Sequence, residues 1–108
     1  MWVISLNVRL ELIAVEAIAR GGINSVSPEI SEIFRCALRN RANKLAIVHN
    51  HPSGTPDPSD ADLVYTRQLI RAAQTLRIQI LDHVIVGLPT AQRPKDYASL
   101  RELGLFAL

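Results

Sequence analysis

The feature that most constrains the fold is an uninterrupted apolar run, Leu45 to Val48, which leads directly into His49-Asn50-His51. A short apolar run without polar alternation is typical of a central strand that is covered on both faces of its sheet. We therefore predict a central strand over Lys44 to Val48. The segment that follows, Pro52 to Pro58, is rich in proline, a composition typical of a loop.

Two further apolar stretches lie near the N-terminus. Trp2 to Leu6 and Leu12 to Ile18 are separated by the short segment Asn7 to Arg9. This pattern predicts two antiparallel strands joined by a turn. After the second stretch, the pattern is broken by residues that favour turns and loops, namely Gly21, Gly22 and Asn24.

Two helices are predicted from capping residues and from apolar spacing. The first begins at Ser27, a favoured N-cap, with Pro28 in the first helical position, and it ends near Asn40. Its buried stripe follows helical spacing and consists of Ile30, Ile33, Phe34, Ala37 and Leu38. The second helix begins at Ser59, and its core side is marked by Leu63, Leu69, Ile70, Ala73 and Leu76.

The rest of the chain supplies another strand, Ile78 to Val86, which is ended by Gly87. The tail from Tyr97 to Leu108 is compatible with either a last strand or a helical turn. The predicted order is strand, strand, helix, strand, helix, strand. This order indicates an α/β (α+β) fold with one mixed sheet flanked by helices, and a length of 108 residues fits a single domain over 1–108.

Bulk properties narrow the class of protein. The lone cysteine, Cys36, excludes an internal disulfide, and no apolar run is long enough to cross a bilayer. The N-terminus lacks the features of a signal peptide, so we expect a cytoplasmic protein that does not engage a membrane. The formal net charge of +2 is too small to indicate nucleic-acid binding by itself. The oligomeric state is left open.

The two histidines at the end of the predicted central strand are candidate metal ligands. Side chains two residues apart on a strand point to the same side, so His49 and His51 face one way. A catalytic Zn²⁺ site takes three protein ligands and keeps one position open. Asp62 is the best third ligand, because it lies in the first turn of the helix that follows the proline-rich loop. Asp57 and Asp60 are the competing carboxylates.

Ser59 and Asp62 also fit a structural role. Ser59 lies three residues before Asp62 at a helix start, which resembles a capping arrangement. The two roles are compatible, since Ser59 can cap backbone amides while its hydroxyl also faces the metal site.

At this point the residues resemble those of a known family. The pattern His49-x-His51, followed after seven residues by Ser59-x-x-Asp62, is similar to the motif of JAMM metallopeptidases. Three longer segments resemble the RadC-type JAB domain of the JAMM/MPN+ metallopeptidase-like family: AIVHNHPSG at 46–54, LDHVIVG at 81–87 and SLRELG at 99–104. The resemblance covers nearly the whole chain.

The resemblance implies a JAB/MPN-type fold, which is itself similar to that of cytidine deaminases. It implies that His49, His51 and Asp62 are Zn²⁺ ligands and that Ser59 is a catalytic residue, hydrogen-bonded to the metal water or the developing oxyanion. The implied reaction is hydrolysis of a peptide or isopeptide bond, with zinc polarising the carbonyl and lowering the pKa of its water. The peptide or protein substrate is not identified by the sequence.

The chain departs from the family in one respect. In RadC-type domains the general-base glutamate comes just ahead of the first strand, and that position falls before residue 1 here. The candidates inside the chain, which do not match that position, are Glu11, Glu16, Glu29 and Glu32. We also expect the family's N-terminal helix-hairpin-helix region to be absent. Two functions stay open: a zinc-dependent metallopeptidase, or a non-catalytic metal-binding interaction domain.

Two other functions are disfavoured because their motifs are missing. Nucleobase deaminases combine His-x-Glu with Pro-Cys-x-x-Cys, whereas this chain has one cysteine. DNA binding is suggested by the DNA-repair label of the RadC family, but we find no helix-turn-helix, zinc finger or dense basic patch. We interpret His83 as a buried core histidine rather than a fourth ligand, and Cys36 as a packing residue.

Overall fold

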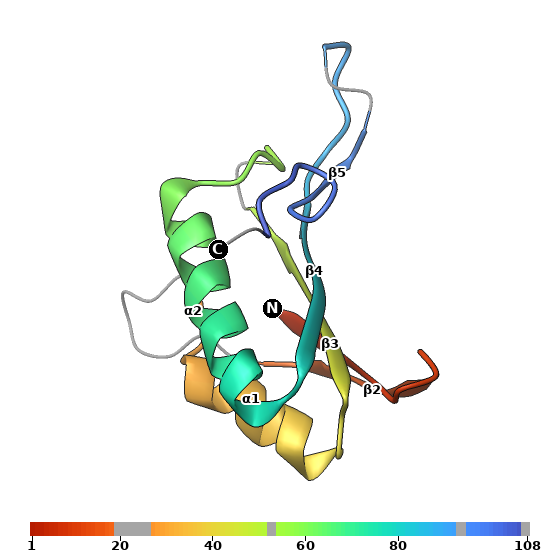
Figure 1. Cartoon of the computed structure of the whole chain (residues 1–108). Coiled ribbons are helices and arrows are strands. Elements are labelled where there is room, and N and C mark those ends of the chain that lie inside the picture. The colour runs from red at the N-terminus through yellow and green to blue at the C-terminus, as the bar shows by residue number, and fades with distance from the viewer. Residues whose placement is uncertain (19–26, 52–53, 93–94, 107–108) are drawn as a thin grey trace.

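The computed structural model describes residues 1–18, 27–51, 54–92 and 95–106. Within these ranges (Figure 1) the elements in chain order are β1 (Trp2–Leu6), β2 (Leu12–Ala17), α1 (Ile30–Arg39), β3 (Lys44–Asn50), α2 (Asp60–Leu76), β4 (Gln79–Val86) and β5 (Tyr97–Ser99). Residues 100–106 form turns. The tail therefore contains a short strand followed by turns, and the predicted order of the earlier elements is confirmed.

The strands form one mixed sheet in the order β2-β1-β3-β4-β5. Strand β1 is antiparallel to β2 and β3, whereas β3 is parallel to β4, and β4 is antiparallel to β5. Parallel strands need a crossover connection, and α2 supplies it between β3 and β4. The predicted α/β (α+β) class with one mixed sheet is confirmed, as is the central position of β3.

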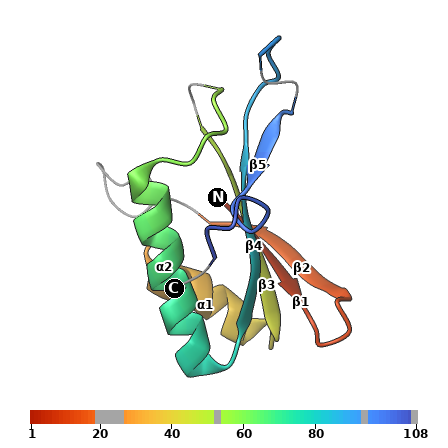
Figure 2. The same ribbon diagram turned by 45° about the horizontal axis from the view of Figure 1, so that its top comes forward.

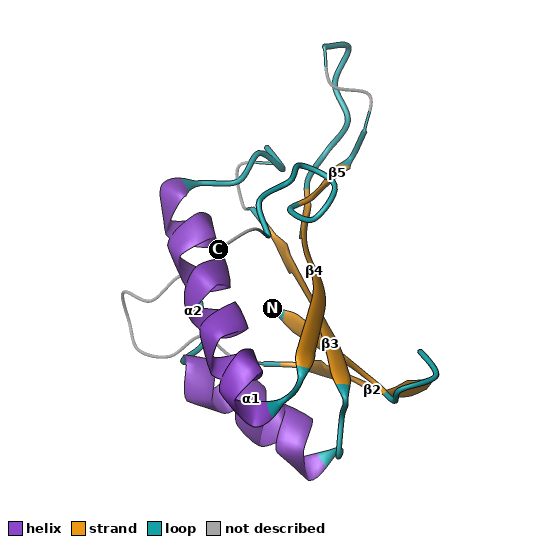
Figure 3. Ribbon diagram, in the orientation of Figure 1, coloured by secondary structure: helices purple, strands orange, loops and turns teal. Residues whose placement is uncertain are grey.

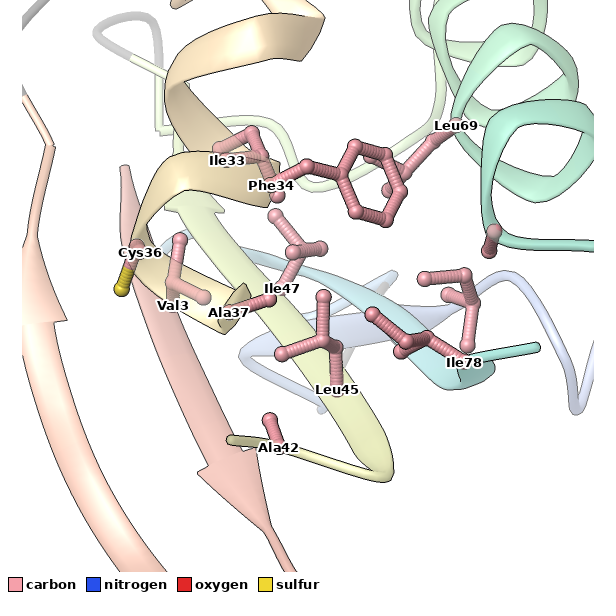
Figure 4. Close-up of a cluster of buried hydrophobic side chains, with 12 residues drawn as sticks. Val3, Ile33, Phe34, Cys36, Ala37, Ala42, Leu45, Ile47, Leu69 and Ile78 are labelled. Carbon is pink, nitrogen blue, oxygen red and sulfur yellow. The ribbon is translucent and has the colours of Figure 1, made fainter. Parts of the chain in front are cut away.

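Both helices lie on the same face of the sheet (Figure 2). Their side chains share one apolar core with β1, β3 and β4 (Figure 4), which includes Val3, Ile33, Phe34, Ala37, Leu45, Ile47, Leu69 and Ile78. On β3, Leu45 and Ile47 point into this core and are fully buried, whereas Ala46 and Val48 are only partly buried. The prediction that β3 is covered on both faces was therefore wrong, because the helices cover one face only.

Helix α1 begins later than predicted. It starts at Ile30, and its N-cap is Glu29, whose backbone is extended and whose side chain makes no capping hydrogen bond. The carbonyl of Pro28 accepts a hydrogen bond of 2.9 Å from the Tyr65 hydroxyl of α2. This tertiary contact ties down the segment that the sequence assigned to the first helical turn, and the prediction of Ser27 as N-cap was wrong.

Two leucines that were assigned to the core sides of the helices are exposed. Leu38 on α1 is 56% exposed. Cys36 on the same helix is buried, as its interpretation as a packing residue predicts. Leu76 is 42% exposed. It is the last residue of α2, and Arg77 then adopts a left-handed conformation that ends the helix.

The predicted break at Gly21, Gly22 and Asn24 lies outside the described residues. Within the described part of the chain, neither helix is long and apolar enough to cross a membrane.

Candidate metal centre

The end of β3 and the start of α2 lie beside each other, joined by the proline-rich loop (Figure 3). Every second side chain of β3 lies on the face of the sheet that the helices cover, as expected for a strand. These side chains are Leu45, Ile47 and His49. Strand β3 continues beyond the predicted end at Val48, so His49 lies within it. His51 follows the strand, and its backbone N–H donates a hydrogen bond of 3.3 Å to the carbonyl of Val86. The sheet therefore positions both histidines.

Asp62 is positioned by the N-terminal cap of α2. Ser59 is the N-cap, and its Oγ accepts a hydrogen bond of 3.1 Å from the backbone N–H of Asp62. In return, the backbone N–H of Ser59 donates to Asp62 Oδ2 at 2.8 Å. This reciprocal pair is a capping box, so the predicted capping role of Ser59 is confirmed. It also locks the Asp62 carboxylate at the helix start.

The three candidate ligands converge. His49 Nε2 lies 3.3 Å from Asp62 Oδ1, and His51 Nε2 lies 3.0 Å from Asp62 Oδ2. The three ligand atoms lie within 4.8 Å of one another, and the described residues contain no other such group. The competing carboxylates, Asp57 and Asp60, are exposed and outside the group. The predicted convergence of the two histidines with Asp62 is confirmed.

The hydrogen-bond geometry calls for a proton or a cation between His51 and Asp62. His51 Nδ1 lies 2.7 Å from the carbonyl oxygen of Thr55. A carbonyl carries no proton, so Nδ1 is the donor, and the neutral ring then presents a lone pair on Nε2. That lone pair faces the Asp62 carboxylate, which also only accepts. Two acceptors at 3.0 Å need a proton or a cation between them.

The electrostatics of the site favour the metal-binding forms of His49 and Asp62. Burial lowers the pKa of His49, although the nearby Asp62 acts in the opposite direction. Burial acts to raise the pKa of Asp62, but hydrogen bonds from Ser59 and the nearby histidines outweigh it, and the pKa lies below its ordinary value. A neutral imidazole and an ionised carboxylate are the forms that bind metals, and two nitrogens with one carboxylate oxygen suit Zn²⁺.

The hydroxyl proton of Ser59 is not used by the cap. Ser59 is exposed, and in the capping box its Oγ acts as an acceptor. The oxygen therefore has its proton left to donate. This geometry agrees with a hydrogen-bonding role toward a substrate, which stays a prediction.

Two glutamates form ion pairs elsewhere in the described part of the molecule. Glu16 on β2 pairs with Arg39, and Glu32 on α1 pairs with Arg35. Neither belongs to the group formed by the two histidines and Asp62. In the described part of the chain, no glutamate joins that group.

Behind the site lies a histidine that sequence reasoning placed in the core. His83 on β4 is fully buried, and burial lowers its pKa to about 4. Its Nδ1 lies 2.6 Å from Thr66 Oγ1, and its Nε2 lies 2.8 Å from His49 Nδ1. The interpretation of His83 as a buried, hydrogen-bonded histidine is confirmed. Thr66 was missed, although its spacing of four residues from Asp62 places both on one side of α2.

Comparisons with known proteins support the resemblance seen in the sequence. A family model described as RadC-like JAB domain matches residues 1–105. A UPF0758 protein of Desulforudis audaxviator is 39% identical over 105 residues, which is 97% of this chain and 43% of that protein. A UPF0758 protein of Caldanaerobacter subterraneus is 42% identical over 85 residues, covering 79% of this chain and 36% of its own length.

A third relative, a UPF0758 protein of Thermosynechococcus vestitus, is 43% identical over 101 residues, which is 94% of this chain and 38% of that protein. The chain thus spans about two fifths of the length of these curated relatives.

Proposed function

Because this chain belongs to the RadC-like JAB domain family, we propose that His49, His51 and Asp62 bind one Zn²⁺ ion and that this centre hydrolyses peptide or isopeptide bonds. One observation carries the proposal: His51 donates from Nδ1 to the Thr55 carbonyl at 2.7 Å, so a neutral His51 turns an Nε2 lone pair toward the Asp62 carboxylate at 3.0 Å, and a cation between them would satisfy both groups. His49 Nε2 completes the set at 3.3 Å from the same carboxylate.

The residues of the chain have distinct roles in this proposal. When bound, the ion supplies Lewis acidity, which polarises a carbonyl and makes a nearby water more acidic. His49 and His51 hold it from the sheet, and Asp62 holds it from the helix start. Ser59 donates its free hydroxyl proton to the substrate oxygen that gains negative charge. The chain matches only part of the length of its relatives. The substrate of any longer protein that contains this domain therefore has to be identified by experiment.

A second function, a metal-binding interaction domain without catalysis, is favoured by one observation. Glu16 and Glu32 are engaged by Arg39 and Arg35, and the group around Asp62 contains no glutamate among the described residues. A positioned general base contributes typically about 10²–10⁴-fold to rate. Zinc binding together with undetectable cleavage would support this second function.

The direct test of the metal proposal is zinc content and affinity. We expect the purified protein to bind one equivalent of Zn²⁺ by elemental analysis, and His51→Ala and Asp62→Asn each to abolish retention. The asparagine in the second variant keeps an oxygen for the capping box but loses the ligand charge, so the helix start is preserved. The matched control is Asp60→Asn, an exposed carboxylate on the same helical turn. Zinc loss in Asp60→Asn equal to that in Asp62→Asn would refute the ligand assignment.

A further inference from the structure

A chain of hydrogen bonds runs from α2 through two histidines into the proposed metal centre. Thr66 Oγ1 donates to the backbone carbonyl of Asp62 at 2.8 Å and lies 2.6 Å from His83 Nδ1. His83 Nε2 lies 2.8 Å from His49 Nδ1. Thr66 and His83 are 1% and 0% exposed, so water does not compete for these contacts.

The direction of each hydrogen bond in this series follows from the first residue in it, Thr66. Thr66 donates its single hydroxyl proton to the Asp62 carbonyl at 2.8 Å, an oxygen that can only accept. Thr66 Oγ1 must then accept from His83, which places the His83 proton on Nδ1. A neutral His83 is left with a lone pair on Nε2, and this nitrogen accepts from His49 Nδ1. His49 then carries its own lone pair on Nε2, the atom that faces Asp62.

The opposite order would lose the hydrogen bond from Thr66 to the Asp62 carbonyl. If Thr66 donated to His83, two oxygens would face each other at 2.8 Å without a proton between them. The protons would then shift to Nε2 on both rings. His49 would donate that N–H to Asp62 Oδ1, 3.3 Å away, and would have no lone pair left there for a metal. Only the first order leaves His49 ready to bind a cation.

We propose that Thr66 and His83 are positioning residues that hold His49 in the tautomer with its proton on Nδ1 and its Nε2 lone pair directed at the metal. The proposal rests on the proposed function in one respect, the role of His49 as a ligand. His51 is held in the same tautomer more simply, by the Thr55 carbonyl. Partners that orient a ligating histidine typically change metal affinity by about 10–100-fold.

The experiment reads tautomers and zinc affinity separately. Long-range ¹H–¹⁵N NMR of the histidine rings, recorded on the folded metal-free protein, identifies which nitrogen carries the proton. Zinc affinity is measured by competition with a chelator at fixed pH. The variants are Thr66→Val, which removes the hydroxyl but keeps the shape, and Thr66→Ser, which keeps the hydroxyl. Thr75→Val is the matched control, because Thr75 makes the same type of bond to Arg71 on an exposed face of α2.

We expect His49 and His83 of the parent protein to carry their protons on Nδ1. In Thr66→Val the tautomers should become mixed and the zinc affinity should fall about 10-fold or more, whereas Thr66→Ser and Thr75→Val should behave like the parent. A proton on His83 Nε2 in the parent would overturn the proposal, and so would parent-like zinc affinity in Thr66→Val. The tautomers are measured without metal. Failure of the parent to bind zinc would therefore refute the proposed function, while the NMR data would still show which nitrogens carry the protons.

Variants at His83 provide a second route that does not depend on Thr66. His83→Phe removes the acceptor for His49, whereas His83→Gln offers an amide oxygen near the same place. We expect His83→Phe to weaken zinc binding without abolishing it, and His83→Gln to restore part of the loss. Equal affinities in both variants and the parent, with folding confirmed by NMR, would contradict a positioning role.

Discussion

Asp62 serves both the helix and the proposed metal site. Its Oδ2 accepts the backbone N–H of Ser59 at 2.8 Å and lies 3.0 Å from His51 Nε2. A carboxylate oxygen has more than one lone pair, so both contacts are possible at once. The start of α2 and the geometry of the site are therefore coupled through one side chain.

Glu16 is a second residue whose contacts affect a measurable property, the dependence of stability on pH. It accepts hydrogen bonds from Asn40 at 2.9 Å and from the thiol of Cys36 at 3.3 Å, and it pairs with Arg39. The bonds from Asn40 and then Cys36 are the main causes that lower the pKa of Glu16 below its ordinary value of 4.5. The ionised form is thus favoured in the folded protein.

We predict that Glu16→Gln destabilises the protein in a pH-dependent way. A lowered folded pKa gives stability that is fully present above the unfolded pKa and is lost as pH falls through the folded one. The difference in unfolding free energy between the parent and Glu16→Gln should therefore be constant near neutral pH and shrink below about pH 4.5. Urea denaturation across pH measures it. Glu11→Gln, on the exposed turn before β2, is the control, and an equal pH effect there would contradict the assignment.

At the scale of elements, the site is built from a strand end, a loop and a helix start. Strand β3 contains His49 near its end, His51 follows directly after it, and α2 returns the chain with Asp62 in its first turn. The capping box satisfies N–H groups that a helix start otherwise leaves unpaired. The stability of this element can therefore be measured apart from metal binding.

We predict that Ser59→Ala destabilises the metal-free protein by about 1 kcal/mol, because the N–H of Asp62 loses its acceptor. Ser59→Asn should recover most of this loss, since asparagine is also a good N-cap. The measurement is the free energy of unfolding in the presence of a chelator. Ser31→Ala, an exposed serine inside α1, serves as the control. If Ser31→Ala cost as much as Ser59→Ala, the cap would not be the cause.

At the scale of the whole molecule, the sheet brings the start of β1 beside the site. Trp2 pairs with Val48 in the antiparallel register, so Met1 lies next to the histidine end of β3. Besides burial, which is the larger cause, the positive N-terminal amino group also lowers the pKa of His49. A segment placed ahead of β1 would therefore enter the neighbourhood of the proposed metal centre.

We predict that the 108-residue chain binds zinc but cleaves peptide and isopeptide substrates slowly. A form extended at the N-terminus with a glutamate just ahead of β1 should be faster by about 10²–10⁴-fold, the usual contribution of a general base. Its control is the same extension with glutamine. Turnover is compared among these proteins and Glu32→Gln, which tests the glutamate on α1. Rapid metal-dependent cleavage by the unextended chain, unchanged in Glu32→Gln, would show that the site needs no such base.

Much of the fold and of the candidate site was predictable because the rules involved are local. Strand periodicity put His49 and His51 on one side, and the cap at Ser59 set the start of α2 and hence the position of Asp62. These residues span a single strand–loop–helix unit, so a short stretch of sequence contains the information. The order of the predicted elements indicated the α/β class, and the family motifs added the JAB/MPN type and the expected role of Ser59.

Only the tertiary structure decided what lies behind and around that unit. His83 is 34 residues from His49, and its place beside it depends on the parallel register of β3 and β4. The coverage of one face of the sheet and the exposure of Leu38 and Leu76 depend on how the helices pack. Strand pairing and helix packing bring together residues that are far apart in the sequence. Local propensity does not determine which strand register, or which face of the sheet, buries the most apolar surface.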